Sequence, residues 1–207
     1  MDITFQDLLI SGQNRVFEYV EFQVQAKKEF FLKNKKYGAS WICYRPQTIW
    51  RRNWNKGLRI RSIQDKAGIQ FVGDPIEDEL KAIYNSSILG MIITDRATRE
   101  GLDTVNQIDT SEEIDAEVLY VEAQEKCFLL MKQKDHDYNG AWVTMTIADI
   151  IDEIMTKLFR AKTILDNRAD IPPEELKKLL NEIWMDVANY AAFGFILILK
   201  GIDPLKF

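Results

Sequence analysis

The chain has 207 residues, a formal net charge of −5, and 46% hydrophobic and 11% aromatic residues. This length and apolar content allow a sizeable core in one domain or two small ones, and the acidic balance argues against a general nucleic-acid-binding surface. Two cysteines, Cys43 and Cys127, form no disulfide framework and indicate a reducing compartment. The first residues, MDITFQDLLISGQNR, lack the basic and apolar regions of a secretion signal, so we expect a cytoplasmic protein.

Helical spacing of apolar residues dominates the first half of the chain. A first helix is expected over roughly residues 15–34. Pro46 is placed to open a second helix that runs toward Ala67 and stops at Gly68, and Pro75 is placed to open a third. The residues expected on the inner faces are Phe17, Val20, Val24 and Phe31 in the first helix and Ile76, Leu80, Ile83 and Ser87 in the third.

The middle of the chain is polar, acidic and without periodicity over residues 95–113, which predicts a linker. A fourth helix is expected over about residues 112–134. The spacing of Thr146 and Asp149 is that of a capping box, which predicts that a fifth helix begins there and ends near Asn167.

The last helix is expected from the Pro172–Pro173 pair to Leu199. Its segment IWMDVANYAAFGFILIL is strongly apolar, but it is interrupted by Asp186 and Asn189 and is short for a bilayer of about 30 Å. We therefore expect a buried core helix and no membrane partner.

An internal repeat organises the whole chain. KNKKYGASW (residues 33–41) returns as KDHDYNGAW (residues 134–142), and the ungapped match extends through residues 65 and 166. Eight of 33 aligned positions are identical, where average composition would give about two. The identical pairs are Lys33/Lys134, Tyr37/Tyr138, Trp41/Trp142, Ile49/Ile150, Lys56/Lys157, Arg59/Arg160, Ile63/Ile164 and Asp65/Asp166. The pattern predicts an all-α fold of two related three-helix repeats, residues 15–94 and 114–200, that pack together as a helical bundle. Residues 95–113 are expected to form the acidic linker between them.

Acidic residues form a stripe on the last helix, where Glu182, Asp186 and Asn189 are spaced to share one face. Buried carboxylates are costly unless they are paired or metal-bound. Glu122 and Glu125 lie one turn apart on the fourth helix, and the four carboxylates together would suit Mg²⁺. The alternatives are a polar seam neutralised by nearby cations and two ordinary surface glutamates.

Cations recur at fixed spacing: Lys157 and Arg160 in the fifth helix repeat Lys56 and Arg59 in the second. Such a pair suits a phosphate chain. The alternative is a set of structural salt bridges with the aspartates of the same helices or with the acidic helix.

Aromatic residues of the repeated loop, Tyr138 and Trp142, either stack on a base or plug the helix junction. The basic run over residues 45–61 would also suit nucleic acid. However, the second copy has Asp152 and Glu153 in that run, so a solvated helix face is the preferred interpretation and a nucleic-acid partner is not expected.

These motifs resemble the nucleotide-modification-associated domain family of phages and bacteria. The resemblance is to that family's KN-x-DYG-x-x-W loop, R/K-x-x-RI helix and helix ending in D-x-x-NY, over residues 21–93 and 118–199. The loop departs from the family pattern in both repeats, where it reads KNKKYGASW and KDHDYNGAW. The helical architecture and acidic residues are similar to the MazG and dimeric dUTPase group of all-α nucleoside triphosphate pyrophosphohydrolases. In that group, acidic residues of two helices bind Mg²⁺ and a metal-bound water is thought to attack the triphosphate.

The resemblance implies that Glu122, Glu125, Glu182 and Asp186 bind the metal. Lys157 and Arg160 would hold the phosphates, with Asn189 nearby. The group's E-E-x-x-E run is not intact here, its E-x-x-D is E-x-x-x-D, and the first repeat has Ala82 and Ser86 where the second has Asp186 and Tyr190.

The second repeat is therefore the expected working half, and the first a degenerate packing partner. The function implied is Mg²⁺-dependent hydrolysis or binding of (deoxy)nucleoside triphosphates. The alternative is a catalytically inactive nucleotide-binding or assembly protein. One chain would supply the bundle that single-copy relatives build as dimers, and a homodimer of this chain is a further option.

Overall fold

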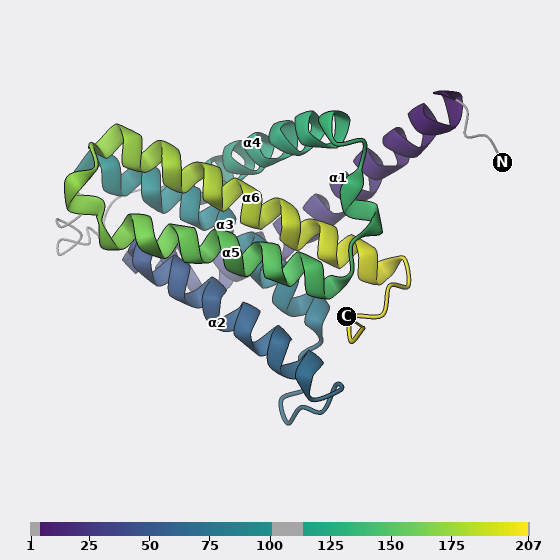
Figure 1. Cartoon of the computed structure of the whole chain (residues 1–207). Helices are drawn as coiled ribbons and strands as arrows, with labels where there is room; N and C mark the ends of the chain where they lie inside the picture. The colour runs from purple at the N-terminus through teal and green to yellow at the C-terminus, as the bar shows by residue number, and fades with distance from the viewer. Residues whose placement is uncertain (1–4, 101–113, 207) are drawn as a thin grey trace.

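The computed structural model describes residues 5–100 and 114–206, and over these residues the secondary structure is entirely helical (Figure 1). The long helices are α1 (Phe5–Tyr37), α2 (Pro46–Asp65), α3 (Ile76–Glu100), α4 (Ala116–Asp137), α5 (Ile147–Asp166) and α6 (Pro173–Leu199). Short 3₁₀ helices are η1 (Ser40–Cys43), η2 (Ala141–Thr144) and η3 (Arg168–Asp170). The predicted all-α helical bundle is confirmed.

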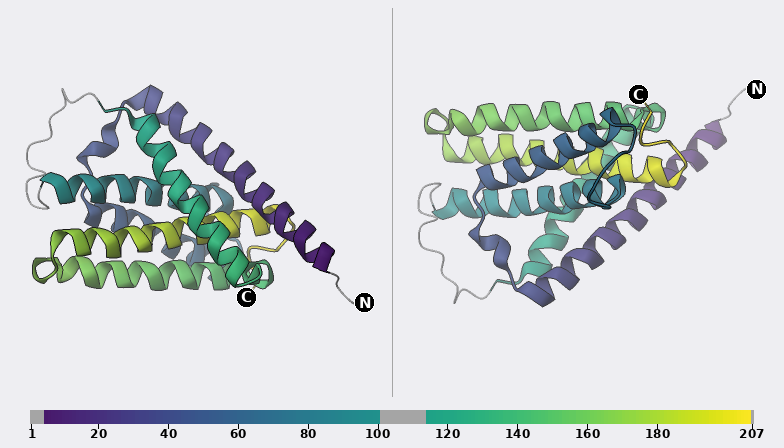
Figure 2. Two further views of the ribbon diagram at one scale, coloured as in Figure 1. Left: turned by 90° about the horizontal axis from the view of Figure 1, so that it is seen from above. Right: turned by 90° about the horizontal axis from the view of Figure 1, so that it is seen from below.

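The two halves of the bundle are related by a pseudo-twofold axis. Each helix packs against its counterpart: α3 against α6, α2 against α5, and α1 against α4. Figure 2 shows α1 and α4 lying side by side across the other four helices. At the axis, the Gln23 Nε2 donates to the Gln124 carbonyl and the Gln124 Nε2 donates to the Gln23 carbonyl, both at 3.1 Å. The sequence offset between these two residues, 101, is the offset of the repeat.

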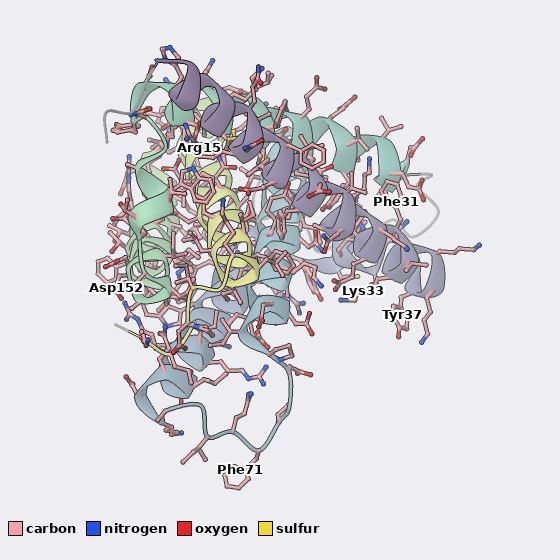
Figure 3. All side chains as sticks on the ribbon, turned by 90° about the vertical axis from the view of Figure 1, so that its right-hand side faces the viewer. Arg15, Phe31, Lys33, Tyr37, Phe71 and Asp152 are labelled. Atoms are coloured by element: carbon pink, nitrogen blue, oxygen red, sulfur yellow. The ribbon has the colours of Figure 1, made fainter. Side chains whose placement is uncertain are left out.

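Most helix ends lie where local signals predict them. The Thr146–Asp149 capping box is present, and α5 ends at Asp166, beside the predicted Asn167. Gly68 has φ +85° and donates its N–H to the Ile63 carbonyl, which closes α2 as expected of a glycine at this position. Beyond it, the α2–α3 loop projects from the bundle with Phe71 exposed at its tip (Figure 3).

The predicted linker overlaps the end of a helix. α3 continues through residues 95–100, and residues 101–113 lie outside the described part of the chain. The fourth helix begins at Ala116 rather than near residue 112, because the Asp115 side chain accepts from the Val118 N–H and caps it there.

The predicted inner face of α1 is wrong for Phe17, Val20 and Val24, which are 63%, 38% and 54% exposed. The helix also begins ten residues earlier than expected, at Phe5 rather than Arg15. Its buried face consists of Tyr19, Phe22, Ala26 and Phe30. Both sets have helical spacing, and packing against α4 and α6 selects the second. In α3, by contrast, all four predicted inner residues are buried: Ile76, Leu80, Ile83 and Ser87.

The apolar helix α6 lies in the core of the bundle. Among the described helices, it alone is long and apolar enough to cross a bilayer by length and composition, and 67% of its most apolar window is buried inside the protein. This burial is what a core helix requires. Cys127 is buried against this core and Cys43 is exposed, and both are free thiols.

Two glycines allow the central helices α3 and α6 to approach. A Cβ on Gly90 would lie 3.0 Å from Trp184 Cδ2, and one on Gly194 would lie 3.1 Å from Ile150 Cγ2. These glycines are equivalent across the pseudo-twofold axis and face equivalent residues, since Leu80, which corresponds to Trp184, lies beside Gly194. The crossing is therefore packed too closely for side chains at either position.

We expect Gly90→Val and Gly194→Val each to lower the free energy of unfolding by about 1–3 kcal/mol, because the added methyl groups overpack the helix crossing. Urea denaturation followed by circular dichroism measures this change. Gly73→Val is the control, since a Cβ at this loop position meets no atom within 4 Å. Equal effects at all three positions would contradict the packing explanation.

Candidate functional site

A cavity of about 250 Å³ lies in the second repeat, where α4, η2, α5 and α6 meet. Its charged and amide lining includes Lys134 from α4, Lys157 from α5, and Asp186 and Asn189 from α6. The repeat thus brings together residues that are widely separated in its sequence. We call this cavity the second-repeat pocket.

Two lysines surround one carboxylate in the second-repeat pocket. The Lys157 Nζ lies 2.9 Å from Asp186 Oδ2, and the Lys134 Nζ donates to Asp186 Oδ1. The Asp186 side chain is only 14% exposed, whereas that of Lys134 is 45% exposed. The cluster carries a formal charge of +1, so it favours an anion, and its lysines have donors to offer one.

Asn189 presents an unused hydrogen-bond donor to the pocket. Its Oδ1 accepts from the Tyr19 hydroxyl of α1 at 2.5 Å, which leaves Nδ2 buried without a partner among the described residues. In the first repeat, the equivalent Asn85 accepts from Tyr120 but donates its Nδ2 to the Ala26 carbonyl at 3.2 Å. A buried donor left unpaired is costly, so the Asn189 amide is suited to a ligand acceptor.

The two aromatic residues of the repeated loop have different roles. Trp142 is buried and stacks on Phe193 with ring centroids 4.4 Å apart, and its Nε1 donates to Asp135 Oδ1 at 3.0 Å. Trp142 therefore plugs the helix junction. Tyr138 is 69% exposed at the pocket and has a face available for stacking.

Tyr190 adds a neutral phenol to the lining. Burial, followed by the nearby charges of Glu153 and Asp186, raises the pKa of Tyr190 to about 12. Its hydroxyl therefore keeps its proton at neutral pH and remains a hydrogen-bond donor.

A cation from the first repeat supports the loop of this pocket. Figure 3 shows Arg15 on α1. Its Nε lies 3.0 Å from Asp135 Oδ1 and 3.1 Å from Oδ2. Both side chains are about nine-tenths buried. Gly140, at φ +66°, leaves room for this guanidinium, because a Cβ there would lie 2.5 Å from Arg15 Cζ. We did not predict this pair from the sequence.

The structure does not gather the four predicted metal ligands. Glu122, Glu125 and Glu182 are exposed. The buried face of α4 consists of other positions, including Ala123, Gln124 and Cys127. No three His, Cys, Asp or Glu side chains of the described residues lie close enough together to hold a metal ion. Because both Asp186 oxygens already bind lysines, this donor set does not fit a protein-held Mg²⁺.

Of the four predicted phosphate-binding cations, only Lys157 lines the second-repeat pocket. Lys56 lies 2.8 Å from Glu79 Oε2, and Arg59 binds the same buried carboxylate and the Val72 carbonyl. These two cations neutralise Glu79 and fasten the α2–α3 loop. Arg160 is exposed on α5, outside the lining of this pocket.

Comparison with known families finds a match in each repeat. The sequence model of a family described as nucleotide modification associated domain 1 matches residues 33–93 and 134–198, which together are more than half of the chain. Neither a curated protein nor a solved structure matches it. The matched segments include the repeated loops and the α6 residues that line the second-repeat pocket.

Proposed function

Because the chain belongs to the nucleotide modification associated domain 1 family, we propose that it binds a nucleotide in the second-repeat pocket. The observation that carries this proposal is the Asn189 Nδ2, which is buried without a partner in the described part of the chain and shares the pocket lining with Lys134 and Lys157. An amide donor beside two ammonium groups offers hydrogen bonds to a base or sugar and charge to a phosphate.

In this proposal the phosphate of the nucleotide binds the two lysines of the pocket. Phosphate oxygens replace the carboxylate oxygens of Asp186 as acceptors for the Lys134 and Lys157 ammonium groups, and a phosphate monoester carries more negative charge than a carboxylate. The Asp186 carboxylate then becomes free to accept from a sugar hydroxyl or an exocyclic amine. Tyr138 lies at the pocket with an exposed ring on which the base stacks.

The proposal is binding rather than metal-dependent hydrolysis, which makes it the second of the two functions inferred from the sequence. Pyrophosphohydrolase chemistry of the MazG type would require several carboxylates around a metal ion. Here three of the four candidates are exposed and the fourth binds lysines. Binding through lysines and an amide needs none of them as metal ligands.

We expect Lys157→Ala to weaken nucleotide binding by about tenfold or more, because a charge-assisted hydrogen bond contributes about 1.5–3 kcal/mol. Equilibrium dialysis against the common ribonucleoside and deoxyribonucleoside mono- and triphosphates measures this effect. Arg160→Ala is the matched control: it removes the same charge from the same helix, one turn away and outside the pocket, and it should leave the affinity nearly unchanged.

Equal losses in the two variants would refute the proposed location of the phosphate. The dialysed samples are also incubated with Mg²⁺ and separated by chromatography. Monophosphate and pyrophosphate produced by the wild-type chain alone would replace the binding proposal with the hydrolase.

A further inference from the structure

The first repeat has a cavity of its own, of about 270 Å³, between α1, η1, α2 and α3. We call it the first-repeat pocket. It occupies the place equivalent to the second-repeat pocket, because matching residues line both. These residues are Lys33, Tyr37, Trp41 and Asn85, which correspond to Lys134, Tyr138, Trp142 and Asn189. The sequence predicted a degenerate site here, since Ala82 stands where the second repeat has Asp186.

The lysine–carboxylate–lysine cluster is nevertheless present, built from other positions. Glu29 of α1 lies 2.5 Å from the Lys33 Nζ and 3.4 Å from the Lys81 Nζ. The second repeat has Leu130 and Met185 at the positions matching Glu29 and Lys81. Thus each repeat has one carboxylate between two ammonium groups, from α1 in the first and from α6 in the second, although Lys81 also lies 3.2 Å from Asp78 Oδ1 and is outside the lining of the first-repeat pocket. The loss of acid at Ala82 therefore does not remove the cluster.

The first-repeat pocket also has an additional cation. Arg52 lines it, with its guanidinium 4.9 Å from the centre of the Tyr44 ring, whereas the second repeat has Glu153 at the matching position. The charged residues that line this pocket, Lys33, Arg52 and Glu29, carry a formal charge of +1, whereas those that line the second-repeat pocket, Lys134, Lys157, Asp135 and Asp186, sum to zero. A more positive pocket favours a ligand with more phosphate charge.

Ser86 gives this pocket its own open hydrogen-bonding group. The residue is 6% exposed and lines the cavity, and its Oγ is buried without a partner among the described residues. The second repeat has Tyr190 at this position, so the serine also leaves more room. A buried hydroxyl without a partner is costly and is suited to a bound oxyanion.

We infer that the first-repeat pocket is a second ligand site, which takes a nucleoside triphosphate in preference to a monophosphate. Arg52 and Lys33 hold the terminal phosphates, and Ser86 donates to a phosphate oxygen. The ligand class rests on the proposed function, but the existence of an anion site here rests on the residues of the first repeat alone.

Equilibrium dialysis of the full chain with labelled ribonucleoside and deoxyribonucleoside triphosphates tests this inference. The wild-type chain should bind two equivalents. Arg52→Glu, which introduces the acidic residue of the second repeat at an exposed position, should weaken one of them by about tenfold or more. Ser86→Tyr, which fills the cavity with the residue that the second repeat has there, should remove the same equivalent. Lys157→Ala should weaken the other one only.

The possible outcomes separate the two sites. A single equivalent that is lost in Lys157→Ala and unaffected by Arg52→Glu would overturn the second site and leave the proposed function standing. A single equivalent lost in Arg52→Glu and retained in Lys157→Ala would support the first-repeat pocket and overturn binding in the second. No binding of any nucleotide would overturn both.

Discussion

Replacing Arg15 by Ala is expected to lower the free energy of unfolding by about 3–5 kcal/mol, the usual effect of breaking a buried ion pair from one side. The Arg15 guanidinium contacts both oxygens of Asp135, and the side chains are 11% and 8% exposed. Without it, the Asp135 carboxylate would stay buried with the Trp142 Nε1 as its remaining donor in the pocket wall. Urea denaturation measured by circular dichroism gives this loss directly.

A second substitution that should restore the stability lost in Arg15→Ala is indicated by the equivalent positions around the first-repeat pocket. The positions equivalent to Arg15 and Asp135 are Ala116 of α4 and Asn34 of α1, and the Asn34 Oδ1 accepts from the Trp41 Nε1 at 3.4 Å beside the first-repeat pocket. The double variant Arg15→Ala/Asp135→Asn reproduces this neutral arrangement and should recover most of the lost stability. A double variant as unstable as the sum of the two single ones would show that the ion pair is not what couples these residues.

Replacing Trp184 by Ala is expected to cost about 3–5 kcal/mol, since a large cavity opens between the central helices. Trp184 is fully buried against Gly90, and its Nε1 donates to the Thr94 Oγ1 at 3.1 Å. The substitution therefore removes both packing and the donor to a buried hydroxyl. Thermal and urea denaturation of the variant measure the loss.

Trp54→Ala is the control for the size of the side chain, because Trp54 is only partly buried on α2. It should destabilise the chain clearly less than Trp184→Ala. If the two variants lose the same stability, the crossing of α3 and α6 is not the centre of the core that the structure indicates.

The sequence was sufficient to predict the helices that local signals define. The capping box at Thr146, the proline at Pro46 and the glycine at Gly68 act within one or two helical turns, so their effects can be read without the fold. The face of α1 could not be read in this way. Phe17 and Phe22 both belong to apolar stripes, and the choice between the stripes depends on α4 and α6, which come much later in the chain.

Only part of the candidate site could be predicted, because the rest depends on contacts between helices that are distant in the sequence. Asp186 and Asn189 line one pocket, as their spacing on one face of α6 indicated, and Lys157 of α5 lines it with them. Spacing along one helix does not determine which side is exposed, and this is why the placement of Glu122 and Glu125 could not be foreseen. The contributions of Arg15 and Tyr19 were missed because these residues reach the second-repeat pocket from the other repeat.

The contacts of Tyr19 and Tyr120 have a consequence for how the chain holds itself together. Tyr19 of the first repeat binds Asn189 of the second, and Tyr120 of the second binds Asn85 of the first, so a lining asparagine of each pocket is bound by a helix of the opposite repeat. We therefore expect that neither repeat is stable when it is folded on its own. A fragment cut within the 101–113 segment would expose the apolar faces of α1 and α3, and we expect the intact chain to unfold as a single cooperative unit because one core cluster includes residues of both repeats.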